Sequence, residues 1–348
     1  MRILTVIGMG KLGGAETFFV TLNRAFRRAG HTVHAAQRPS AVNDKLLEDA
    51  GIPNTRLPWG GRYDFWSKYV LGGVMRKFRP DVVLSFAGWA SERIPPGDYP
   101  VIGRLGGYHR LECFKRCHHL VCNAPQLVRY AADGGYDPAR IHLIPNFPNL
   151  QDSPKVDRAS LNTPEGAPLA LALGRLHPSK EHDILIKAAA QIPELYVWIA
   201  GEGDQRAMLE ALARDLNVAE RVKFLGWRTD RAGLFKAADV CVFPSRVEPF
   251  GNVAVEAWGY GSPLVAARAN GPAWLARDRE DALLVPIDDP DALAVAIREV
   301  IGSRALAETL VRNGRKRVAA EFSEEAVVAQ YIDVFHKARA EMKLKAVA

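Results

Sequence analysis

Residues 238–257 read ADVCVFPSRVEPFGNVAVEA, and this stretch predicts a strand, a loop and a helix in succession. The apolar run at 240–243 predicts a buried strand that delivers Pro244 and Ser245 to a loop. Gly251 then begins a helix whose first backbone amides have no acceptor inside the helix. Strands of this kind belong to parallel sheets covered by helices, and such sheets bind ligands at the carboxyl ends of their strands.

Two carboxylates lie in this stretch, Glu248 in the loop and Glu256 on the helix. Carboxylates accept hydrogen bonds from hydroxyl groups, so the pair can hold two hydroxyl-bearing parts of one ligand, such as a sugar and a ribose. Glu248 stands between Val247 and Pro249, and these apolar neighbours disfavour its interpretation as an ordinary exposed acid.

A second loop, GRLHPSKEHD at 174–183, follows the apolar run 169–173 and precedes a helix. Arg175 and Lys180 therefore lie together at the carboxyl end of a sheet. Arginine binds phosphate as a fork and lysine as a point charge, so the two can neutralise a diphosphate without a metal. The alternative is a pair of surface cations without a role.

Short apolar runs alternate with helical patterns in both halves of the chain, and the segment 151–168 between them is almost free of apolar residues. This predicts an α/β protein with two Rossmann-like domains, whose parallel sheets face each other across an interdomain cleft. The expected parts are an N-terminal domain, a linker and hinge, a second domain and a C-terminal helix that packs back across the domains, at 1–150, 151–168, 169–325 and 326–348. The expected strands are 3–7, 32–36, 81–86, 101–104, 120–123, 141–144, 169–173, 196–200, 222–225, 240–243, 264–266 and 283–285.

The net charge of +7 is uneven, because residues 1–150 hold 20 Lys and Arg against 11 Asp and Glu. A basic half suggests an acidic partner, such as an anionic lipid surface, a phosphorylated glycan or a nucleic acid, and a merely solvated surface is an equal alternative. No nucleic-acid-binding module is recognisable, so no nucleic-acid partner is expected. The absence of a long apolar run predicts a cytoplasmic protein, with peripheral contact at the inner face of the membrane as an option.

Two segments resemble metal sites. The first gathers three cysteines and two histidines at 113–122, but it lacks the separated ligand pairs of zinc modules. The second is Asp289-Pro290-Asp291, which is better explained as a helix start with a capping aspartate. We therefore expect no metal and no cofactor.

The first strand is followed by GMGKLG at 8–13, which matches the G-x-G-x-x-G pattern of dinucleotide-binding loops. NAD binding also requires an acid at the end of the second strand, where this chain has Gln37 and Arg38. Arg38 could face a 2′-phosphate, which keeps an NADP-dependent oxidoreductase as an alternative. A glycine loop before a helix supports other phosphates equally well.

Taken together, these segments closely resemble glycosyltransferase family 4, whose members are retaining, nucleotide-sugar-dependent enzymes of the GT-B fold. The Glu248-x7-Glu256 spacing is the signature of that family, and the resemblance covers essentially the whole chain. Further matching segments are GGAE at 13–16, IPN at 144–146, GRL and Lys at 174–180, GEG at 201–203, LGW at 225–227 and GSPLVA at 261–266.

The resemblance implies a donor site assembled from several loops. It implies that Gly13 and Gly14 approach the diphosphate or the transferred sugar, and that Arg175 and Lys180 hold the diphosphate. It implies that Glu248 contacts the hydroxyls of the transferred sugar and that Glu256 binds the ribose. The backbone amides that would meet the sugar or the phosphates are those of Phe250, Gly251, Asn252 and Val253. The family also places a histidine near the donor sugar. His109 is the candidate here, and Tyr108 is the alternative.

The implied activity is metal-independent, retaining transfer of a hexosyl or related group from a nucleotide-diphosphate sugar to a glycan or lipid-linked acceptor. Synthesis of cell-surface polysaccharide or lipopolysaccharide is the expected context. The leaving phosphate would accept the proton of the acceptor, so no dedicated base is required, and donor binding would close the two domains. A sugar-phosphate phosphorylase and a non-transferring nucleotide-sugar binder of the same fold remain alternatives.

Overall fold

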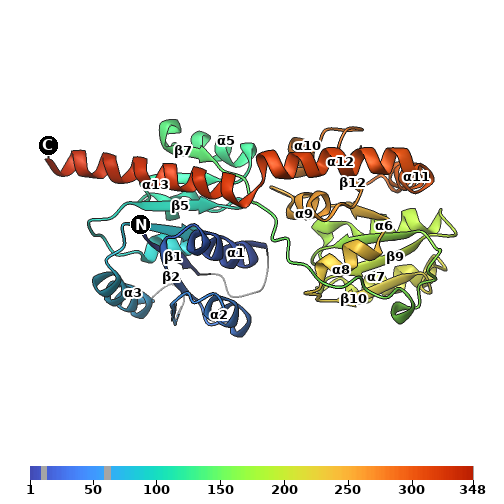
Figure 1. Cartoon of the computed structure of the whole chain (residues 1–348), viewed down its shortest axis with the longest axis horizontal. Coiled ribbons are helices and arrows are strands. Elements are labelled where there is room, and N and C mark those ends of the chain that lie inside the picture. The colour runs from blue at the N-terminus through green and yellow to red at the C-terminus, as the bar shows by residue number, and fades with distance from the viewer. Residues whose placement is uncertain (9–13, 59–63, 348) are drawn as a thin grey trace. The chain divides into compact units, whose positions relative to one another are not determined.

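The computed structural model describes residues 1–8, 14–58 and 64–347, with the backbone alone at 345–347 (Figure 1). The chain forms two compact units. The first comprises Met1–Asn146 together with Glu324–Ala348, and the second comprises Phe147–Ser323. Among the described helices, none is both long and apolar enough to cross a membrane.

The first unit contains a seven-stranded sheet in the order β3-β2-β1-β4-β5-β6-β7, and the paired strands are parallel. The order reverses beside β1, which is the position where open α/β sheets bind ligands. The strands are β1 (Arg2–Ile7), β2 (Thr32–Gln37), β3 (Asn54–Arg56), β4 (Val82–Phe86), β5 (Val101–Leu105), β6 (His119–Cys122) and β7 (Ile141–Leu143).

Successive side chains of each strand point to opposite faces of this sheet, and helices pack against both faces. On β1, Leu4 and Val6 pack into a core formed with α3 (Phe65–Phe78), α4 (Gly88–Arg93) and α5 (Pro125–Asp133). Thr5 points to the other face, where its hydroxyl donates to Asn23 Oδ1 of α1 (Gly14–Arg28) at 2.6 Å. Helix α1 packs in turn against α2 (Ala41–Glu48) and α13 (Glu324–Val347).

Helix α13 is fixed to the first unit by buried aromatic and polar contacts. The Phe26 ring of α1 lies 5.8 Å from the ring of Tyr331 and 5.7 Å from that of Phe335. The buried guanidinium of Arg104 donates to Tyr331 Oη at 3.2 Å and to Asn146 Oδ1. The C-terminal helix is therefore part of the first unit's core.

The second unit contains a six-stranded parallel sheet in the order β10-β9-β8-β11-β12-β13. One face packs against α6 (His182–Ala190), α7 (Arg206–Asp215) and α11 (Pro290–Gly302), and the other against α8 (Arg231–Ala237), α9 (Asn252–Tyr260) and α10 (Asn270–Leu275). Helix α12 (Arg304–Glu321) contributes Leu310 to the first core and Val318 to the second. The strands are β8 (Leu169–Leu173), β9 (Tyr196–Ala200), β10 (Val222–Gly226), β11 (Val240–Phe243), β12 (Leu264–Ala267) and β13 (Leu283–Val285).

The polar segment at 151–168 lies within the second unit and is held there by hydrogen bonds. Arg158 is buried and donates to the carbonyl oxygens of Ala237 and Ala167, both at 2.9 Å. The buried Trp198 donates from Nε1 to Thr163 Oγ1 at 2.9 Å. These contacts fasten the segment to the sheet of the second unit.

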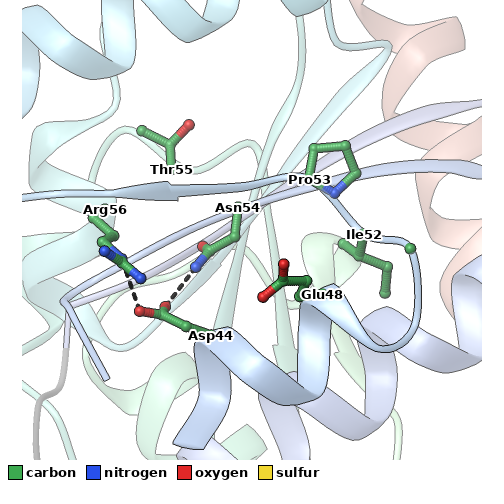
Figure 2. A pocket seen from close by; sticks show the side chains of 8 residues that line it. Asp44, Glu48, Ile52, Pro53, Asn54, Thr55 and Arg56 are labelled. Atoms are coloured by element: carbon green, nitrogen blue, oxygen red, sulfur yellow. Dashed lines mark hydrogen bonds and ion pairs between the residues drawn. The ribbon is translucent and has the colours of Figure 1, made fainter. Parts of the chain in front are cut away.

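All twelve expected strands are present, which confirms the predicted α/β class. The missed strand, β3, contains only Asn54, Thr55 and Arg56 and lies at the sheet edge, so it has no apolar run. Figure 2 shows the shallow pocket beside it, where Asp44 of α2 accepts hydrogen bonds from Asn54 Nδ2 at 2.6 Å and Arg56 Nε at 2.8 Å. These polar contacts hold α2 to the sheet edge.

Candidate active site

The loop between β11 and α9 depends on glycine at position 251. Gly251 adopts φ 107, a left-handed conformation that other residues rarely adopt. A Cβ atom there would lie 3.3 Å from Phe243 and 3.3 Å from Leu275, and 3.8 Å from Glu248 Cγ. The predicted helix start is confirmed, with Asn252 as the first residue of α9.

The loop at 174–183 and the loop at 244–251 meet through an ion pair between Lys180 Nζ and Glu248 Oε2, and we call them the paired loops. Both side chains are largely buried, with 23% and 17% of their surface exposed. The strands that precede these loops, β8 and β11, are neighbours in the sheet. The structure therefore gathers Lys180, Glu248 and Gly251 at the carboxyl end of one sheet.

Backbone contacts fasten the same two loops. Ser179 O accepts hydrogen bonds from the amides of Arg246 at 3.0 Å and Val247 at 3.3 Å. The guanidinium of Arg246 pairs with Glu181 and Asp288. Burial raises the pKa of Glu181, Asp288 adds to this effect, and Arg246 opposes it. This cluster fixes the loop that carries Lys180.

Arg175 lies on the same loop as Lys180, but its side chain is exposed and forms no ion pair with a described residue. Its backbone position is set by its neighbours, because Gly174 N donates to Ala200 O at 3.1 Å and Leu176 N donates to Glu202 O at 3.0 Å. The guanidinium is thus an exposed cation on the loop that carries Lys180.

His182, which sequence reasoning left without a role, is buried behind this loop as the first residue of α6. Its Nε2 lies 3.8 Å from the position that a Cβ of Gly174 would occupy. Burial, with Lys180 nearby, lowers the pKa of His182 to about 4. A neutral imidazole therefore supports the loop.

Glu256 lies on α9 and is 8% exposed. Its carboxylate pairs with Arg231 of α8. Burial raises the pKa of Glu256, and Arg231 opposes this rise. Arg231 is a second residue that sequence reasoning missed, since it stands in no recognisable motif.

The start of α9 is anchored by apolar side chains. Phe250 is 2% exposed, and its ring lies 6.1 Å from that of Trp274. Val253 packs in the same core. Gly271 N donates to Glu248 O at 2.8 Å, so the loop before the helix is tied to α10. The first turn of α9 is thereby held at the sheet edge beside Glu248.

The candidates in the first unit are placed less completely. Gly13 lies outside the described residues, and Gly14 begins α1. His109 is half-buried, and burial lowers its pKa, with Arg104 adding to the effect. Tyr108 is 53% exposed and packs edge-on against Tyr130, whose hydroxyl donates to His109 O at 2.8 Å. The roles predicted for these residues stay predictions.

Neither segment that resembled a metal site forms one in the described chain. Among the residues that the structure places, no three side chains of the metal-binding types are grouped to hold an ion. The cysteines at 113, 117 and 122 are free thiols. Asp289 caps α11 by accepting a hydrogen bond from Ala292 N at 2.8 Å, which confirms its interpretation as a capping residue.

Two family models match the chain. Residues 12–152 match Glycosyltransferase Family 4, and residues 154–317 match Glycosyl transferases group 1. Two relatives from Rhizobium meliloti (strain 1021) are named lipopolysaccharide core biosynthesis glycosyltransferases. LpsE is 34% identical over 345 residues, or 95% of this chain and 98% of its own. LpsD is 35% identical over 334 residues, or 95% of this chain and 97% of its own.

The crystal structure of HepE from Anabaena in complex with UDP-glucose is similar in fold, with a TM-score of 0.85 at 23% identity. The match covers 97% of this chain and 100% of HepE. The fold is thus of GT-B architecture, and the family models and the two relatives define a glycosyltransferase. The chain belongs to glycosyltransferase family 4, as its sequence predicted, and the interpretation as an oxidoreductase loses its support.

Proposed function

We propose that this enzyme transfers a sugar, with retention of configuration, from a nucleoside diphosphate sugar to a glycan acceptor of the lipopolysaccharide core. The names of the two Rhizobium relatives support this acceptor, and the UDP-glucose complex of HepE supports this class of donor. The observation that carries the proposal is the ion pair between Lys180 and Glu248, which joins a cation for phosphate to an acceptor for hydroxyls.

In the proposed mechanism, the donor exchanges this ion pair for contacts of its own. The diphosphate takes over the Lys180 ammonium, and the freed carboxylate of Glu248 accepts hydrogen bonds from sugar hydroxyls. Both side chains are largely removed from water, so each contact is stronger than it would be at the surface. The site thereby responds to a ligand that carries both phosphate and sugar.

Departure of the diphosphate builds up negative charge, which is the main charge to stabilise in glycosyl transfer. In the proposal, Lys180, Arg175 and the amides at the start of α9 stabilise that charge. Glu256 would accept a hydrogen bond from the ribose, and Arg231 favours its charged form against the effect of burial. The leaving phosphate would take the acceptor's proton, so the proposal needs neither a dedicated base nor a metal.

The first test replaces Lys180 with glutamine and measures release of nucleoside diphosphate from a panel of nucleotide sugars with a core oligosaccharide acceptor. We expect kcat/KM to fall by roughly 100-fold or more, as for the loss of one transition-state cation or donor. The matched control is Lys155→Gln, because Lys155 pairs with Glu165 at 2.9 Å in the polar segment 151–168, outside the two loops.

Full turnover by Lys180→Gln would contradict the proposed site. Release that requires inorganic phosphate in place of the acceptor would indicate a phosphorylase, and tight donor binding without release would indicate a binding protein. The anomeric configuration of the product, followed by NMR, tests retention separately, because an inverted product would exclude the same-face mechanism.

A further inference from the structure

One face of α3 exposes aromatic and basic side chains together, and we call it the α3 face. Phe65, Trp66 and Tyr69 are 77%, 68% and 68% exposed. The rings of Trp66 and Tyr69 stack with centroids 5.7 Å apart. The exposed cations of the same face are Lys68, Arg76 and Lys77.

The opposite side of α3 is firmly packed, so the α3 face belongs to an ordered helix. Leu71 and Met75 lie in the core between the first sheet and helices α3, α4 and α5. Asp64 caps the helix by accepting a hydrogen bond from Ser67 N at 2.9 Å. At the other end, Arg79 adopts a left-handed conformation and closes the last turn on Met75 O at 2.8 Å. The exposed aromatic rings are therefore presented by a fixed scaffold.

The charge of this helix is unbalanced. Residues 65–79 contain no Asp or Glu. Lys68, Arg76, Lys77 and Arg79 form no ion pair with any residue that the structure describes. These cations therefore lack the internal carboxylate that pairs with about half of the other arginines in the described part of the chain, and an external anion would complement them.

A basic pocket lies at the carboxyl-terminal end of α3. Arg79 lines it together with Arg2, Arg339 and Lys343, and its volume is about 410 Å³. The carboxylate of Asp81 is already engaged, by Arg339 Nη2 at 2.9 Å and by the backbone amide of Arg2 at 2.7 Å. Asp98 also lines the pocket, but it is outnumbered by Arg2, Arg79 and Lys343, which have no ion-pair partner among the described residues. The excess of positive charge suits a phosphate group.

We infer that the α3 face and this basic pocket together form a docking surface for a membrane of anionic phospholipid. Tryptophan and tyrosine favour the boundary between headgroups and acyl chains, where their rings are buried and their polar atoms stay hydrated. Lysine and arginine beside them are attracted to anionic headgroups. A helix with both features binds in the plane of a membrane surface.

Charge favours this occupant over two others. A neutral glycan would stack on the aromatic rings but would leave the cations without a partner. A second copy of the chain, related by a twofold axis, would set the same positive surface against itself. The inference rests on the proposed function in one respect, because a lipid-borne acceptor would bring the enzyme to a membrane.

The test is sedimentation of the full chain with vesicles of phosphatidylcholine, with or without about one third phosphatidylglycerol. The first variant is Lys68→Glu/Arg76→Glu/Lys77→Glu. Each lost cation weakens binding about fivefold at low salt, so we expect binding to the anionic vesicles to fall on the order of 100-fold. The control, with the same change of charge on exposed cations of the second unit, is Arg214→Glu/Arg312→Glu/Lys316→Glu.

A second variant, Trp66→Ser/Tyr69→Ser, removes the stacked rings and leaves the charge unchanged. We expect a loss of roughly tenfold that persists at high salt, because apolar insertion is not screened. Met208→Ser/Val295→Ser is its control, since both residues are exposed hydrophobics of the second unit. Thermal unfolding confirms that each variant is folded.

Unchanged vesicle binding by both α3 variants, or an equal loss in the controls, would overturn the inference. Loss of transfer to a soluble acceptor without lipid would assign the surface to the glycan, and conversion of a dimer to a monomer would assign it to a second copy. Failure of the proposed function is separable, because a chain that binds anionic vesicles but never releases nucleoside diphosphate would contradict the transferase activity alone.

Discussion

The paired loops of the second unit and the α3 face of the first are both rich in cations, but they treat charge in opposite ways. In the loops, Lys180 and Arg246 each contact a carboxylate of the same unit. On the α3 face, Lys68 and Arg76 contact none among the described residues. Pairing fixes a cation in one geometry and suits a specific ligand, whereas unpaired exposed cations act through their summed field.

This contrast predicts that single substitutions are decisive in the loops and weak on the α3 face. The largest expected effect is that of Glu248→Gln, which keeps the shape of the side chain but removes its charge. The variant loses the charged partner of Lys180 and the carboxylate to which the proposal assigns the sugar hydroxyls. We expect kcat/KM for transfer to fall by roughly 100-fold to 1000-fold.

Glu210→Gln is the matched control, because Glu210 pairs with Arg206 on the outer surface of α7 at 2.9 Å. Steady-state release of nucleoside diphosphate measures both variants. If Glu248→Gln had the kcat/KM of the wild type, single substitutions would not be decisive in the paired loops, and the contrast with the α3 face would fail.

The second prediction concerns a buried cation of the first unit that has no carboxylate partner among the described residues. Arg104→Leu removes the hydrogen bonds that this guanidinium donates to Tyr331 and Asn146, both of which are buried. We expect the unit to lose about 2 to 4 kcal/mol of unfolding free energy. Hydrogen exchange of α13 and urea unfolding measure the loss.

Arg28→Gln is its control, because Arg28 also links α13 to the unit, but through an exposed pair with Glu324. That pair should contribute less than about 1 kcal/mol. Equal losses of unfolding free energy in the two variants would show that burial does not determine how much these contacts stabilise the unit.

The smallest expected effect is a pH dependence in the second unit. The pKa of His182 is about 4 in the folded chain, below the ordinary value of 6.5, so the unfolded chain takes up the proton first as pH falls. The contribution of neutral His182 to the free energy of unfolding is complete above about pH 6.5 and is lost as the pH falls toward 4. At pH 5 the loss is about 2 kcal/mol.

His182→Leu should therefore flatten the pH dependence of unfolding between pH 7 and pH 5, as measured by calorimetry. The same change at the exposed His336 is the control. A steep acid loss that survives in His182→Leu would place the sensitivity elsewhere.

Much of the architecture could be predicted because buried parallel strands are continuous apolar runs, as in Leu169–Leu173. The sequence could not predict β3, which is polar and lies at an edge. The meeting of Lys180 and Glu248 was predictable only through the family resemblance. It depends on the pairing of β8 with β11, and β9 and β10 separate these two strands in the sequence.

Other parts of the site depend on contacts that leave no local pattern. Arg231 pairs with Glu256 because α8 and α9 pack together, and nothing near residue 231 indicates that packing. Arg104 and Tyr331 are 227 residues apart, so their contact depends on the return of α13 to the first sheet. The α3 face could not be predicted either, because exposure is a property of the folded chain.

The return of α13 to the first unit has a consequence for the order in which the protein matures. A nascent chain that has emerged as far as Asn146 holds Arg104 but lacks Tyr331 and Phe335, which are translated only after the whole second unit. The second unit, by contrast, is continuous in the chain and can acquire its native packing while translation is still under way. The half of the enzyme that the ribosome makes first is therefore the half that finishes last.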